Sequence, residues 1–145
     1  MRLQKSIYIG RPAEEVFAFI ADHSNDHRWR GELLSSHIVS DVCEGVGTHL
    51  RQAVSYRGRT AEANFEVTEF EPGRRICFRA RGRLRAHGCY DVQPEGSGTR
   101  LTVSATVELK GEEAMLERYF RQVVEQAAWS DLEQLRLLLE SDEPV

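Results

Sequence analysis

Three polar side chains share the apolar phase of a series of predicted strands, which makes them the residues best placed to orient a small molecule. They are Gln52, Tyr56 and Tyr90. An amide and two hydroxyls donate and accept directional hydrogen bonds, and a few such groups in an apolar pocket fix the orientation of a ligand. The same groups could instead satisfy one another or the backbone. Tyr56 lies near a hairpin end and is expected to reach solvent, so Tyr90 is the strongest candidate.

The residue patterns of the common catalytic sites are largely missing. His49 and His87 fall on the polar phase of their strands, His23 and His27 lie in an irregular segment, and the strand of His37 cannot be registered. The apolar phase shows no pair of acids for acid–base work and no arginine. His23 and His27 have H-x-x-x-H spacing but lie in the irregular segment, and no H-x-x-x-H or E-x-x-H motif falls on a predicted helix. We therefore expect no protein-ligated metal and no cofactor.

The three cysteines, Cys43, Cys77 and Cys89, have no C-x-x-C spacing. Cys77 and Cys89 fall on the polar phase of two strands that are expected to be neighbours. Adjacent strands could bring them together, but reduced thiols in a cytoplasmic protein are the expected state.

These side chains have to be positioned by a sheet and a long helix. A stretch without Gly or Pro, from Glu112 to Glu140, predicts the helix. Its apolar residues recur at helical spacing and form one broad stripe. The stripe consists of Leu116, Phe120, Val123, Val124, Ala127, Ala128, Leu132, Leu135 and Leu139. A two-helix coiled coil is the alternative, but it favours a narrower seam of large residues.

From Leu33 to Leu109 the apolar residues alternate with polar ones, which predicts an antiparallel meander with one apolar face. A turn at Gly58-Arg59 would place Gln52 opposite Phe65 and Leu50 opposite Val67. Turns at Pro72-Gly73 and Gly96-Ser97 would place Val67 opposite Phe78, Phe65 opposite Ala80, and Tyr90 opposite Val103. The apolar face and the helix stripe predict further ligand-contacting residues, namely Phe65, Phe78, Val103, Phe120 and Val123.

The N-terminal part predicts a strand from Leu3 to Ile9 and a helix that starts at Pro12 and ends near Asp22. The polar segment that follows, to Arg30, is irregular or a short second helix and carries Trp29. Trp29 is either a lid residue over a pocket or a plug at the end of the core. The segment is short of other anchors, so we expect it to be mobile.

The composition is that of a single domain spanning residues 1–145, with a net charge of −4. This charge gives no indication of a nucleic-acid partner, and no apolar stretch is long enough for a membrane span or a signal peptide. The predicted fold class is α+β, with seven antiparallel strands curved around the long C-terminal helix and two short helices after the first strand.

Several motifs together resemble a known family. They are Pro12-Ala-Glu-Glu-Val-Phe17, the Trp29 loop, Gly45-Val-Gly-Thr48, the stretch from Phe65 to Ile76, and Gly98-Thr-Arg-Leu-Thr102. In order and spacing these motifs resemble the bacterial polyketide cyclase/dehydrase-like (SRPBCC) group of the START-like helix-grip superfamily. The resemblance covers essentially the whole chain. It implies a cavity between sheet and helix that takes apolar or amphipathic small molecules.

Small residues on the apolar phase support such a cavity independently, because small side chains facing one another leave volume. They include Ala61, Ala63, Ala80, Ala86, Gly88 and Ala105. Sharply curved strands are the alternative reason for small residues. We therefore expect non-catalytic binding of an apolar small molecule, with a polyketide cyclase or dehydratase as the first alternative. An interaction protein that uses the sheet edge or the long helix is the second alternative, and a homodimer is left open.

Overall fold

The computed structural model describes residues 1–56, 58–82 and 85–141. Along the chain the elements are β1 (Arg2–Ile9), α1 (Ala13–Ala21), the 3-10 helix η1 (His23–Asn25), α2 (Asp26–Trp29), β2 (Leu33–Ile38), β3 (His49–Tyr56), β4 (Arg59–Glu71), β5 (Arg75–Arg81), β6 (Ala86–Glu95), β7 (Gly98–Val107), α3 (Glu112–Met115) and α4 (Glu117–Glu140). The expected long helix is therefore interrupted at Leu116, whose backbone φ of −105° and ψ of 27° end the short α3 before α4 begins.

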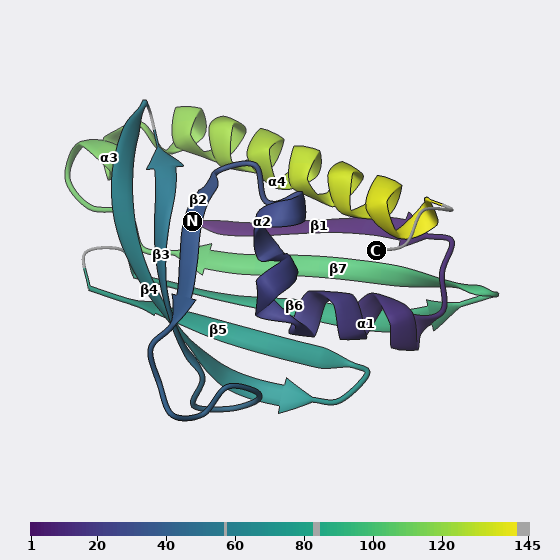
Figure 1. Cartoon of the computed structure of the whole chain (residues 1–145). Helices are drawn as coiled ribbons and strands as arrows, with labels where there is room; N and C mark the ends of the chain where they lie inside the picture. Colours follow the sequence, from purple (N-terminus) through teal and green to yellow (C-terminus); the bar gives the residue numbers. More distant parts are fainter. Residues whose placement is uncertain (57, 83–84, 142–145) are drawn as a thin grey trace.

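The strands form one antiparallel sheet in the order β1-β7-β6-β5-β4-β3-β2. The sheet is strongly curved, and α1, α2 and α4 lie on its inner side (Figure 1). This arrangement confirms the predicted fold class, a seven-stranded sheet wrapped on a long C-terminal helix with short helices after the first strand. Residues of alternating polarity form these strands because each strand has one face on the interior and one in solvent.

Most of the predicted strand register is confirmed. Val67 pairs with Phe78, Phe65 with Ala80, and Tyr90 with Val103. The β3–β4 register is wrong by two residues, because Tyr56 pairs with Arg59 and Gly58 (φ 77°) lies between them instead of opening the turn. Gln52 accordingly lies opposite Ala63. A shift of two residues keeps every side chain on its predicted face, so the inner face is unchanged.

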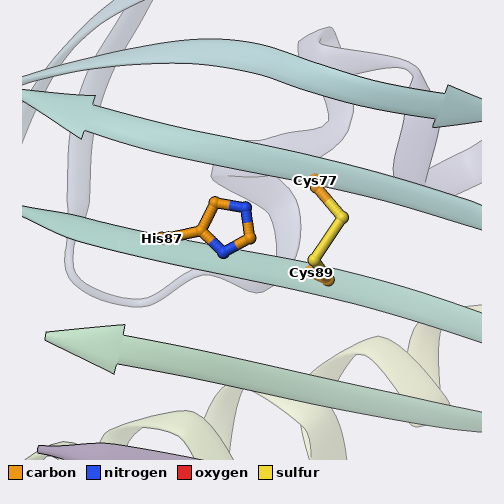
Figure 2. A group of neighbouring side chains, drawn as sticks. All are labelled: Cys77, His87 and Cys89. Carbon is orange, nitrogen blue, oxygen red and sulfur yellow. A yellow bond between two sulfur atoms is a disulfide. The ribbon is translucent and has the colours of Figure 1, made fainter.

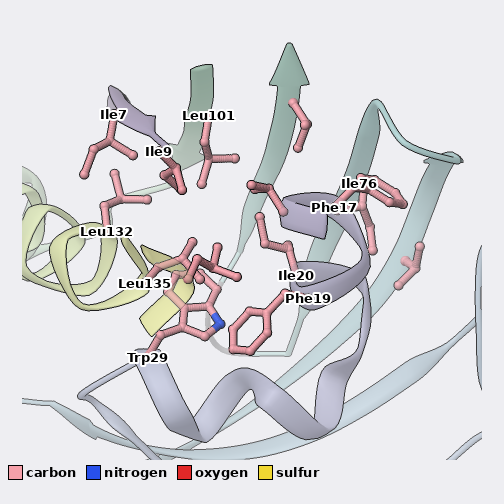
Figure 3. Close-up of a cluster of buried hydrophobic side chains, with 14 residues drawn as sticks. Ile7, Ile9, Phe17, Phe19, Ile20, Trp29, Ile76, Leu101, Leu132 and Leu135 are labelled. Atoms are coloured by element: carbon pink, nitrogen blue, oxygen red, sulfur yellow. The ribbon is translucent and has the colours of Figure 1, made fainter. Parts of the chain in front are cut away.

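The tightly packed core occupies one end of the inner space, where α1 and the C-terminal half of α4 meet the sheet. Its apolar side chains interdigitate in Figure 3. The cluster comprises Ile7, Ile9, Val16, Phe17, Phe19, Ile20, Trp29, Val67, Ile76, Val92, Leu101, Leu132, Leu135 and Leu139. At roughly 25 cal/mol per Å² of apolar surface removed from water, this cluster is a main source of stability.

Packing is looser toward the start of α4. Phe120 is buried there with 2% of its surface exposed, but Val123, which belongs to the predicted stripe, is 39% exposed and Met115 is 86% exposed. The prediction that Val123 packs into the core is therefore wrong. On the inner face of the sheet, residues that a helix-covered face would normally bury completely remain half-buried. They are Phe65, Phe78, Ala86, Gly88, Tyr90, Val103 and Ala105.

On the outer face of the sheet, Cys77 and Cys89 form a disulfide between β5 and β6. The expectation that these two cysteines are reduced thiols is wrong in this structure. They pair directly across the two strands, with 4.1 Å between their Cα atoms. The expected cytoplasmic location rested on reduced thiols and loses this support. Cys43 remains a free, exposed thiol.

Candidate functional site: a polar cluster between α2, β3 and α4

The segment before the site is well anchored. The Asp22 carboxylate accepts hydrogen bonds from the Ser24 backbone N–H at 3.1 Å and from its hydroxyl at 2.6 Å, which starts η1. The Asn25 side chain donates to the Phe19 carbonyl at 3.1 Å, and His23 and Asp26 are both buried. The prediction that this segment lacks anchors apart from Trp29 is therefore wrong.

An aromatic group links α2 to the inner face of the sheet. The Trp29 ring lies 5.8 Å from the Tyr90 ring, and Tyr90 lies 5.7 Å from Phe78, both in edge-to-face geometry. Trp29 is 4% exposed and belongs to the core, as a plug would, and its indole N–H has no hydrogen-bond partner among the described residues. Tyr90 is only half-buried, and the part of the chain that the structure describes offers its hydroxyl no hydrogen bond.

Arg30 is the central cation of the site. Its guanidinium donates to Gln52 Oε1 at 3.0 Å and to Glu32 Oε1 at 3.1 Å, while Gln52 donates to Ser36 Oγ at 3.2 Å. The Arg30 side chain is only 17% exposed. Burial alone would lower the pKa of Arg30, but the nearby Tyr90, Glu32 and Asp26 outweigh it, so the pKa is raised and the group stays charged.

Two carboxyl groups beside Arg30 share a proton. The side chains of Glu32 and Asp131 lie within hydrogen-bond reach of each other, and Asp131 also accepts the Gly31 backbone N–H at 3.0 Å. Burial and then the contact with Glu32 raise the pKa of Asp131 to about 7. Burial disfavours the charged form of Glu32, but Asp131 and Arg30 together lower its pKa. The pair therefore titrates as a unit that joins the start of β2 to α4.

Asp26 is a second acid with a raised pKa. Burial raises its pKa to about 7, Arg30 opposes the shift and Asp22 adds to it. Its carboxylate lies 3.9 Å from His23 Nδ1, a nitrogen without a hydrogen-bond partner among the described residues. Burial lowers the pKa of His23, so the imidazole favours its neutral form. The charge of Asp26 therefore changes near neutral pH, beside an imidazole that favours its neutral form.

The structure brings part of the predicted site together. Trp29, Gln52, Phe78 and Tyr90 surround or contact the polar cluster. Gln52 is hydrogen-bonded to the side chains of Arg30 and Ser36, and not to a tyrosine or to the backbone as the alternative expected. Phe65 and Val103 are half-buried on the same face. Phe120 is buried, and Val123 is exposed near the start of α4. The side chain of Tyr56 lies outside the described residues.

The sequence pattern missed the charged residues of the site. The expectation of no inward arginine and no inward acids is wrong, because Arg30, Asp26, Glu32 and Asp131 gather at the end of α2. The first three lie in or beside a segment without strand periodicity, and Asp131 is a single acid beside the apolar stripe of α4. The one available signal was the density of charge around Trp29, an aromatic residue expected to be buried.

A family model described as "Polyketide cyclase / dehydrase and lipid transport" matches residues 1–135. The chain belongs to this family. Members of the START-like superfamily are also among the similar solved structures, which confirms the resemblance stated from the sequence. A search of curated proteins finds no match.

Solved structures show the same fold at low sequence identity. A Thermus thermophilus protein has a TM-score of 0.84 and 24% identity, with 97% of this chain and all of that chain covered. The Zhui aromatase/cyclase of a Streptomyces species has a TM-score of 0.78 and 15% identity over 97% of this chain and 93% of that chain. A START superfamily protein of Mycobacterium smegmatis has a TM-score of 0.70 and 19% identity over 96% and 94%.

Within this family fold, the polar cluster occupies the inner side of the sheet, between α2 and α4. It can offer a ligand a fixed cation, a hydroxyl and acids whose protonation changes near pH 7. No helix in the described part of the chain is both long and apolar enough to cross a membrane.

Proposed function

We propose that the chain binds an amphipathic small molecule between α4 and the inner face of the sheet. The observation that carries this proposal is that Arg30 and Tyr90 interact electrostatically beside half-buried apolar residues. The Tyr90 hydroxyl has no hydrogen bond within the described residues. Burial raises the pKa of Tyr90, so its hydroxyl stays protonated and can donate. A ligand with an apolar body and an anionic or carbonyl end would satisfy both groups.

The loose packing near the start of α4 supports the location of the apolar end. Phe65, Val103 and Ala105 face inward there without being fully buried, and Val123 lies in the exposed first half of α4. Apolar surface that folding leaves accessible to water becomes a source of binding energy when a ligand covers it.

The first experiment is native mass spectrometry of protein purified without detergent, because a retained molecule would reveal its class. The second is a titration with 8-anilinonaphthalene-1-sulfonate, a probe that joins an aromatic body to one anionic group. Arg30→Gln should weaken its binding by about 1.5–3 kcal/mol and Tyr90→Phe by about 0.5–1.5 kcal/mol.

Matched controls for these variants are Arg59→Gln and Tyr8→Phe, which change exposed residues outside the cluster. Thermal unfolding of each variant separates loss of binding from loss of folding. Equal probe affinity in all four folded variants would exclude the polar cluster as the binding site.

A polyketide cyclase or dehydratase is the second candidate, and the acids favour it. Asp26 and Asp131 exchange protons near pH 7, where acid–base catalysis is most efficient, and Arg30 could stabilise an enolate oxygen. The test is incubation with a poly-β-ketone thioester and mass analysis for loss of water. Catalysis would be established by turnover that Asp26→Asn abolishes while probe binding persists. Absence of turnover in the wild type would favour non-catalytic binding.

The interaction-protein alternative remains a prediction. Its surface would be the apolar side chains exposed in α3 and the first half of α4, among them Met115, Tyr119 and Val123. The same side chains also border the region proposed for the ligand.

A further inference from the structure

A second group of residues with chemical potential lies on the opposite, outer face of the sheet. Cys77 on β5 and Cys89 on β6 lie directly opposite each other, and His87 lies two residues before Cys89 on the same face. Figure 2 shows the imidazole of His87 beside the two sulfur atoms. The two sulfurs and one imidazole nitrogen all lie within 4.8 Å of one another.

We propose that, when the disulfide is reduced, Cys77, Cys89 and His87 form a binding site for a thiophilic d10 cation, Zn²⁺ or Cu⁺. Two thiolates and one imidazole are the donor set that such ions prefer over Mg²⁺ or Ca²⁺. The group has no carboxylate donor that would favour a hard cation.

The distances fit a metal centre after a small adjustment. Metal–sulfur bonds of about 2.3 Å and metal–nitrogen bonds of about 2.0 Å place ligand atoms about 3.5–3.8 Å apart around a tetrahedral ion. Once reduced, the two sulfurs have to separate toward this spacing. His87 is exposed, so its ring is free to turn toward them and a water molecule can fill the fourth position on Zn²⁺.

A cationic side chain lies beside both sulfur atoms. Arg75 Nε lies 3.2 Å from Cys77 Sγ, and Arg75 Nη2 lies 3.2 Å from Cys89 Sγ. A guanidinium at this distance stabilises negative charge on sulfur. Its own charge is offset by Asp91 at 3.1 Å and Glu69 at 3.6 Å, so the group does not repel a cation strongly.

Loading depends on the oxidation state. A dithiol reductant transfers two electrons and two protons to the disulfide and becomes a disulfide itself. A phosphine reductant becomes a phosphine oxide, with water supplying the oxygen and the two protons. Either reductant leaves two protein thiols. Binding of Zn²⁺ then forms two metal–thiolate bonds and one bond to the neutral imidazole, and releases two protons to solvent. The disulfide and the metal complex exclude each other because both use the same sulfur electrons.

The test uses the full chain with Cys43→Ser, which removes the exposed third thiol. After reduction with a phosphine under anaerobic conditions, Co²⁺ is added as a spectroscopic probe and then displaced by Zn²⁺ in competition with a chromophoric chelator. We expect one ion per chain, a thiolate-to-cobalt charge-transfer band, and no such band in the oxidised protein. Cu⁺ is titrated in a parallel arm, and binding of either ion that needs both thiols and His87 supports the site.

His87→Ala should weaken the ion affinity by at least about 10-fold, since it removes a ligand. His37→Ala is the matched control, because His37 is also an exposed strand histidine but lies on β2, away from the group. The oxidised wild type serves as a folded, blocked control in case Cys77→Ser with Cys89→Ser does not fold. Equal affinities of His87→Ala and His37→Ala, or binding by the oxidised protein, would overturn the proposal.

Discussion

The guanidinium of Arg30 donates to the side-chain oxygen of Gln52 at 3.0 Å, which ties the residue after α2 to the middle of β3. Gln52 is 2% exposed and holds Ser36 with its amide nitrogen. The glutamine therefore determines where the central cation of the site lies, although it carries no charge itself.

Replacing Gln52 tests this relationship. Gln52→Leu removes the acceptor and should cost about 1.5–3 kcal/mol of unfolding free energy, because a buried charge loses a hydrogen bond. A double-mutant cycle with Arg30→Met should show a coupling of about 0.5–3 kcal/mol in urea denaturation. Gln93→Leu, at an exposed position of β6, is the control. Purely additive losses would show that the two side chains act independently.

The raised pKa of Asp26 predicts a pH dependence of stability. Its pKa of about 7 in the folded protein lies above the ordinary 3.8, so the folded state binds the proton more tightly than the unfolded state. This contribution is fully present below about pH 4, declines as the pH rises to about 7, and is absent above it.

Asp26→Asn should therefore be more stable than wild type at pH 8, on the order of 2–4 kcal/mol, and similar at pH 4. Denaturant titrations at the two pH values measure this. Asp22→Asn should behave in the opposite way, since the hydrogen bond from the Ser24 side chain lowers the Asp22 pKa and that stabilisation is lost at low pH. A pH-independent difference between Asp26→Asn and wild type would contradict the assignment.

The contrast between Phe120 and Val123 on α4 predicts two very different truncations. Phe120→Ala should cost about 3–5 kcal/mol, because it removes a side chain that is 2% exposed. Val123→Ala should cost under about 1 kcal/mol because that side chain is 39% exposed. Chemical denaturation of both variants checks the comparison, and similar losses would show that α4 packs differently.

Gly98 is the first residue of β7 and lies beside the end of β1, where Ile9 pairs with Thr99. A Cβ atom at this position would lie 2.6 Å from the Ile9 carbonyl oxygen and would also collide with the Tyr8 hydroxyl. Because backbone cannot move aside easily, Gly98→Ala should destabilise the domain by about 1–3 kcal/mol in thermal or denaturant unfolding. Gly31→Ala, whose new atom would approach only the Asp131 carboxylate at 3.7 Å, is the control. A neutral Gly98→Ala would mean that the strands separate there.

The sheet could be predicted from the sequence because, in each strand, the alternation of apolar and polar residues indicates which side chains face the interior. Gly96-Ser97 marks the β6–β7 turn, and the pairing of Tyr90 with Val103 follows from it. At Gly58 the same argument misplaced the turn by one residue, and a hairpin then shifts its pairing by two. A pairing error of two residues leaves each side chain on its predicted face of the sheet, so the prediction of the inward-facing side chains is unaffected.

The polar cluster could not be predicted in the same way. Asp26 and Arg30 lie in and just after the short α2, a segment that the sequence leaves undecided between a loop and a helix. Asp131 lies 100 residues beyond Gly31, so only tertiary packing brings it to them. The pattern placed Cys77, His87 and Cys89 correctly on the outer face. It could not show that the three donors converge, because the metal motifs that were sought lie on single helices and this group spans two strands.

The strand order in the sheet also determines when β1 can pair while the chain is being synthesised. β1 is an edge strand whose neighbour in the sheet is β7, and Arg2 pairs with Thr106. At 5–20 residues per second, the first strand waits roughly 5–20 s on the ribosome before its partner exists. During that time its apolar residues Ile7 and Ile9, which are buried in the folded protein, have no strand to pair with and stay exposed.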